Sequence, residues 1–169
     1  KDLYRQQVAL VAANTKPSSA SLQLQLAKAT NELSMQNHVS TLLQIGLQDV
    51  ALLQFEAAEQ FTSEKALVQQ LQEDILELLE AMIGVAATEL SANQDEKGTD
   101  TKLAISNSQT LALMKIMQQR LHVELNPLLQ RAELTALEQQ QLNLLIQKQE
   151  RLVEAMKRIQ MTKEVLINE

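Results

Sequence analysis

Apolar residues recur at alternating steps of three and four along most of this chain, and this spacing places them on one face of an α-helix. The pattern covers residues 26–61, 67–85, 103–125 and 142–166. Strand-forming features are scarce, because aromatic residues make up 2% of the 169 residues and only 3 Gly and 2 Pro are present. The sequence therefore predicts an all-α protein, with residues 1–169 forming a single domain built as an antiparallel up-down bundle of four long helices.

Local signals place the ends of the first helices. Residues 1–13 are expected to form a short helix, followed by a turn that contains Pro17. Ser18 and Ser19 then offer N-caps for a long helix. We expect this helix to run as far as Phe61 and to bend or break there.

Two further signals mark the later helices. Asn126-Pro127 is expected to interrupt the third long helix, because proline is favoured in the first turn of a new one. Thr135 lies three residues before Glu138, which is the spacing of a capping box and predicts the start of the last helix.

The stretch SANQDEKGTDTK, residues 91–102, is rich in oxygen ligands and turn formers. A calcium loop of the EF-hand type needs oxygen ligands at its fifth and twelfth positions, with glycine at the sixth. With Gly98 at the sixth position, the fifth is Lys97 and the twelfth is Ala104, so calcium is excluded for this motif. We interpret the stretch as a turn between two helices.

No combination of residues predicts catalysis. The two histidines, His38 and His122, are not preceded three residues earlier by the glutamate that a di-iron bundle uses, because Met35 and Gln119 stand there. Carboxylates are spread over helix faces at the spacing of solvated ion pairs. We therefore expect no enzymatic activity, no catalytic residue, no cofactor and no metal site.

Charge and composition exclude other classes. The formal net charge is -6, and the 15 Lys and Arg residues are scattered, so we expect no nucleic-acid binding. With Cys 0, disulfide and thiolate-metal scaffolds are excluded. No apolar run approaches the length of a membrane span.

Polar residues interrupt the apolar stripes at several positions where a leucine would be expected. Such residues fix the register of helices, or they line a small-ligand site between helices. The candidate ligand-binding residues are Gln36, Ser40, Asn107, Thr110 and Gln149.

Two segments carry a resemblance to a known class of protein. LELLEAM at residues 76–82 and AATELSANQ at residues 86–94 precede a short polar turn and a further helix over residues 101–113. This arrangement resembles the extracytoplasmic sensor domains of bacterial transmembrane receptors, that is, sensor histidine kinases and chemoreceptors, in particular the trimethylamine-oxide sensor kinase group. The resemblance implies a homodimer in the periplasm, membrane helices flanking this fragment, and a small molecule or a periplasmic binding protein as the input.

The same resemblance implies that the signal passes through helix shifts of an ångström or two. Two other interpretations remain open. The chain could be a cytosolic helical chaperone or adaptor, of the flagellar or secretion-export type, whose amphipathic helices cover a partner helix. It could also be a purely structural coiled-coil spacer.

Overall fold

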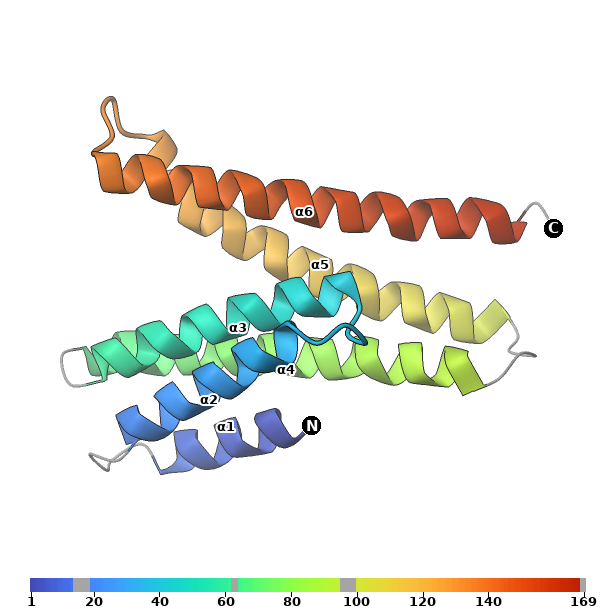
Figure 1. The fold of residues 1–169 in the computed structure, drawn as a ribbon, viewed down its shortest axis with the longest axis horizontal. Coiled ribbons are helices and arrows are strands. Elements are labelled where there is room, and N and C mark those ends of the chain that lie inside the picture. Colours follow the sequence, from blue (N-terminus) through green and yellow to red (C-terminus); the bar gives the residue numbers. More distant parts are fainter. Residues whose placement is uncertain (14–18, 62–63, 95–99, 168–169) are drawn as a thin grey trace. The chain divides into compact units, whose positions relative to one another are not determined.

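The structure, a computed structural model, describes residues 1–13, 19–61, 64–94 and 100–167, and within them it contains six α-helices and no strand (Figure 1). Side chains of residues 91–107 and 158–167 lie outside this description. The helices are α1 (Asp2–Ala12), α2 (Ser19–Ser34), α3 (Thr41–Gln60), α4 (Lys65–Gln94), α5 (Asp100–Leu129) and α6 (Ala136–Ile167). Consecutive helices run antiparallel, so the all-α bundle is confirmed, whereas the described residues form six helices and not four.

The chain divides into two compact units, Lys1–Leu113 and Met114–Glu169. The first contains α1 to α4 and the first part of α5, and the second contains the rest of α5 and α6. The boundary between the units therefore falls inside one helix, α5.

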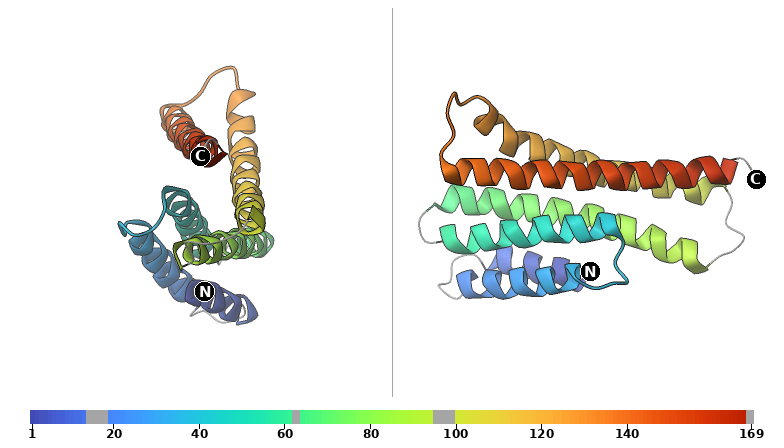
Figure 2. Two further views of the ribbon diagram at one scale, coloured as in Figure 1. Left: turned by 90° about the vertical axis from the view of Figure 1, so that its right-hand side faces the viewer. Right: turned by 45° about the horizontal axis from the view of Figure 1, so that its top comes forward.

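Helices α1 to α4 of the first unit form a ring in which each helix packs against two others, and α3 has the most extensive contacts. Helix α3 packs against α2 and α4, while α1 packs against α2 and α4 (Figure 2). Buried apolar residues lie on most sides of α3, among them Leu42, Ile45, Val50 and Leu53. Burial on several faces is what a helix between two neighbours requires.

The long first helix predicted from residue 18 to Phe61 is wrong, because it breaks between Ser34 and Thr41. The three-four spacing continues through the break, but Gln36 and Ser40 occupy its core-facing positions there. Burying these polar side chains in a continuous helix would cost free energy. A turn instead lets α2 fold back against α3, which covers the apolar surface of α3.

Helix α4 follows its predicted pattern closely. Leu71, Ile75, Leu78 and Val85 are buried at three-four spacing, and the acidic residues on the outer face are exposed or half-buried. Gly46 on α3 allows close packing here, since a Cβ at this position would lie 3.0 Å from the Met82 Sδ atom. Of the predicted interhelical turn over residues 91–102, residues 91–94 belong to α4 and residues 100–102 to α5, and residues 95–99 lie outside the described residues.

The second unit begins within α5. Met114, Met117 and Leu121 are buried, as the third apolar stripe predicts. The predicted interruption at Asn126-Pro127 is wrong, because α5 continues to Leu129 with Pro127 inside it. Proline here removes one backbone hydrogen bond close to the end of the helix, and its fixed φ is compatible with helical geometry.

The start of α6 confirms the predicted capping box. The Thr135 backbone N–H donates to Glu138 Oε2 at 2.8 Å, and the Glu138 N–H donates to Thr135 Oγ1 at 3.3 Å. These reciprocal bonds satisfy two donors that a helix start leaves free. Arg131 also forms an ion pair with Glu138.

Candidate functional site

Two of the five predicted ligand-binding residues lie in the turn between α2 and α3. Gln36 is exposed, so it does not occupy the apolar stripe as predicted. Its backbone carbonyl accepts a hydrogen bond from Gln44 Nε2 at 3.3 Å. Ser40 is half-buried, and its Oγ donates to Glu89 Oε1 on α4 at 2.8 Å, which ties the turn to α4.

The other three predicted residues lie on the later helices. Thr110 is 9% exposed on α5, and Gln149 is half-buried on α6. Asn107 belongs to α5, but its side chain lies outside the described residues. None of the five lines either of the two hollows described below. Whether any of them binds a ligand stays a prediction.

A buried cluster of three glutamines joins α1, α2 and α3 in the first unit. Gln7 and Gln23 exchange two hydrogen bonds of 3.1 Å, and Gln54 Nε2 donates to Gln7 Oε1 at 3.0 Å. All three side chains are 0% exposed. The Gln54 Oε1 atom accepts no hydrogen bond in the described part of the chain. Such a network fixes the register of α1 against its neighbours, because a shifted helix would leave several buried amides unpaired.

Gln54 lies at a core-facing position of the apolar stripe over residues 26–61, but none of the three glutamines is among the predicted candidate residues. Gln7 follows Leu3 by four residues and precedes Leu10 by three, so it too stands at a core-facing position. This spacing was the available signal. It is a weak one, because glutamine also occupies many exposed positions in the chain.

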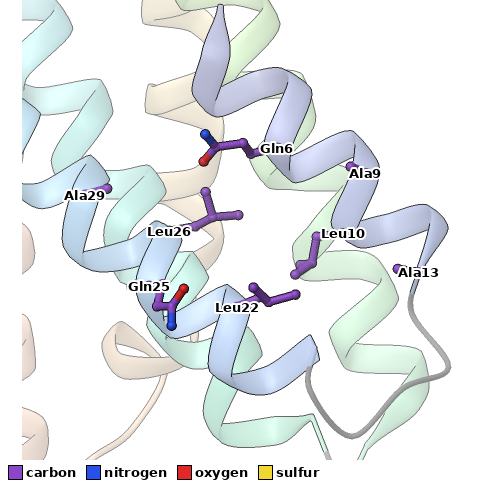
Figure 3. Close-up of a pocket in the computed structure, with 8 residues that line it drawn as sticks. All are labelled: Gln6, Ala9, Leu10, Ala13, Leu22, Gln25, Leu26 and Ala29. Carbon is purple, nitrogen blue, oxygen red and sulfur yellow. The ribbon is translucent and has the colours of Figure 1, made fainter.

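The first hollow is an open groove of about 450 Å³ between α1 and α2 (Figure 3). Leu10 of α1 and Leu22 and Leu26 of α2 point into the space between the two helices. Leu22 remains 45% exposed. The other described lining residues are Gln6, Ala9, Ala13, Gln25 and Ala29, and none of these is charged.

The second hollow, which we call the α1–α4 pocket, has a volume of about 200 Å³. Leucines of the α2 end and of α3 line it together with Leu79, Met82, Ile83 and Ala86 of α4. Lys1, Leu3 and Tyr4 close it from the side of α1. The pocket is therefore mostly apolar, and Lys1 is the charged residue among those described that line it.

Across the part of the chain that the structure describes, no three His, Cys, Asp or Glu side chains gather closely enough to hold a metal ion. His38 and His122 are both exposed. Within the same described ranges, no helix combines the length and the hydropathy that crossing a membrane requires.

Comparison of the chain with protein families, with curated proteins and with solved structures finds no match.

Proposed function

We propose that the chain is the signal-sensing ectodomain of a bacterial transmembrane receptor, non-enzymatic and without a cofactor. The observation that supports it best is the course of α5, which continues across the boundary between the two compact units. A shift or rotation of α5 in the first unit can pass along the same helix into the second. Helix shifts of this kind are a common means of signalling in proteins.

The first unit supplies what an input would act on. It contains two hollows, and residues of α1 contribute to both. In the proposed receptor, a small molecule or a periplasmic binding protein biases the packing of these helices. The receptor is a homodimer, its membrane helices lie outside this fragment, and it binds no nucleic acid.

The location of the chain in the cell tests this function directly. The complete protein, with any cysteines elsewhere replaced, would carry Lys28→Cys on the exposed face of α2. A membrane-impermeant maleimide added to intact cells with a permeabilised outer membrane should label this thiol. The matched control is Ala27→Cys on the same helix, which is 0% exposed and should resist labelling while the protein is folded. Labelling of Lys28→Cys only after cell lysis would contradict the proposed function.

Exposed apolar residues on α6 favour a second candidate, the cytosolic adaptor that covers a partner helix. Leu137 is 67% exposed, Leu144 is 59% exposed and Ile146 is 44% exposed. An amphipathic helix with an uncovered apolar flank is a common docking element. The same labelling experiment separates the two candidates, because an adaptor would be protected from the reagent in intact cells.

A further inference from the structure

The α1–α4 pocket has the composition of a binding site for an apolar group. Its floor is formed by Leu43 and Leu47 of α3 and by Leu79 and Met82 of α4, which are all at most 8% exposed. Displacing water from such a surface favours binding.

The volume limits the size of the occupant. A water-sized group takes up about 30 Å³ of liquid volume. The pocket of about 200 Å³ therefore accommodates about seven non-hydrogen atoms. This number of atoms corresponds to a short aliphatic chain or a single ring. A long-chain lipid or a peptide segment of several residues would not fit into the pocket.

The polar groups of the lining indicate which polar group a bound ligand should carry. Lys1 and Tyr4 belong to the lining, and their side chains end in an ammonium and a hydroxyl group, which can both donate hydrogen bonds. Among the described residues of the lining, Lys1 is the charged one, and its charge is positive. A carboxylate matches both groups, since it is anionic and accepts several hydrogen bonds.

We propose that the α1–α4 pocket binds a short aliphatic carboxylate, with its tail between α3 and α4 and its carboxylate towards Lys1 and Tyr4. This inference deepens the proposed sensor function, because it names the class of ligand, but the purified chain tests it whatever the cellular location.

Binding at this pocket would strengthen the docking of α1. With 11 residues, α1 is too short to be a stable helix on its own. A ligand that touches Leu3 and Tyr4 on one side and α3 and α4 on the other adds contacts that exist only when α1 is docked. It therefore shifts the equilibrium towards the docked state.

Hexanoate is the probe for the test, because its five-carbon tail and carboxylate match the estimated size. Titration into the purified 169-residue chain, followed by calorimetry or ligand-observed NMR, should show saturable binding. Ala86→Leu fills the pocket and is expected to weaken binding by about tenfold or more. Ala29→Leu is the matched control, since it makes the same change in the groove between α1 and α2 and should leave the affinity unchanged. Thermal melting of both variants verifies that they fold.

Hexanol tests the head group separately. It should bind more weakly than hexanoate, and the double variant Lys1→Gln/Tyr4→Phe should remove this difference while hexanol binding persists. Absence of saturable hexanoate binding, or a loss caused by Ala29→Leu and not by Ala86→Leu, would overturn the site. Equal binding of hexanol and hexanoate would overturn the assignment of a carboxylate. Either result is distinguishable from failure of the sensor function, which the maleimide labelling reports independently.

Discussion

Helices α3 and α6 carry apolar residues at the same three-four spacing, yet they differ in how much of that apolar surface is buried. In α3, Val50 and Ala57 are 0% exposed, and buried residues lie on most sides of the helix. In the described part of α6, Leu152 is 2% exposed, whereas Leu142 and Leu145 on the same stripe are only half-buried. The spacing identifies the apolar stripe of a helix in both cases, but packing against other helices decides how much of it is buried.

The difference in burial between α3 and α6 also distinguishes residues that stabilise the fold from residues that could contact a partner. The buried residues of α3 contribute mainly to folding, because they are almost completely removed from water within the chain. The apolar flanks of α6 contribute little to folding while they remain exposed, and they are available to a partner. Substitutions at buried positions of α3 should therefore lower the free energy of unfolding more than substitutions at exposed positions of α6.

The largest effect is expected for Val50→Asp in α3. A buried carboxylate without a partner would destabilise the first unit by more than about 4 kcal/mol, a large part of the stability of a typical domain. Denaturant unfolding followed by circular dichroism measures this loss. The control is Leu52→Asp on the same helix, where the side chain is 64% exposed. It should change the free energy of unfolding by at most about 0.5 kcal/mol, and equal losses for the two variants would refute the burial pattern of α3.

In α6, the expected loss is smaller and confined to the buried stripe. Leu152→Ala should cost about 3 kcal/mol, because Leu152 is 2% exposed. Leu144→Ala, at a residue that is 59% exposed, should cost at most about 0.5 kcal/mol. Thermal or denaturant unfolding of both variants makes the comparison. A loss of similar size for Leu144→Ala would mean that this flank is covered in solution.

In the glutamine cluster of the first unit, stability should depend on whether the buried amides keep their hydrogen-bond partners. Gln7→Ala leaves the amides of Gln23 and Gln54 without their buried partner and is expected to cost about 2 kcal/mol. Replacing all three glutamines by leucine, which has a similar size, should restore stability or increase it, since no unpaired polar group remains. Denaturant unfolding of both variants decides this. A triple variant less stable than Gln7→Ala would show that the network itself stabilises the fold.

The smallest effect is expected at the capping box of α6. Thr135→Ala removes the side-chain acceptor of the Glu138 N–H and should cost about 1 kcal/mol. Faster amide exchange in the first turn of α6 should accompany the loss. Thr41→Ala, at the first residue of α3, changes the same residue type where no side-chain cap bond is present and should have little effect. Equal effects at both positions would contradict the capping role of Thr135.

Much of the fold could be predicted because helical periodicity depends on local spacing alone. Leu71, Ile75 and Leu78 were predicted on one stripe of α4 and are all buried there. The turn between α2 and α3 could not be predicted in this way, since the three-four spacing passes through it without a change of phase. What breaks the helix is the free energy gained when α2 packs on α3, and this depends on contacts between distant residues.

The candidate site was less predictable for the same reason. Polar residues on an apolar stripe were a useful signal for Gln54, which is buried in the glutamine cluster, and a misleading one for Gln36, which is exposed in a turn. No single stretch of the sequence predicts the α1–α4 pocket. Its lining comes from four helices and one turn, and each contributes ordinary apolar residues.

The most direct test is hydrogen–deuterium exchange along the whole chain. It shows whether packing against other helices, and not the spacing of apolar residues alone, determines how strongly α3 and α6 are protected. We expect the amides in the middle of α3, near Val50, to exchange slowest, at a rate close to that of global unfolding. The amides around Leu144 in α6 should exchange faster than those near Val50. This difference should persist at every protein concentration. Protection in α6 equal to that in α3 would contradict the account, because it would require the apolar flanks of α6 to be covered as completely as those of α3.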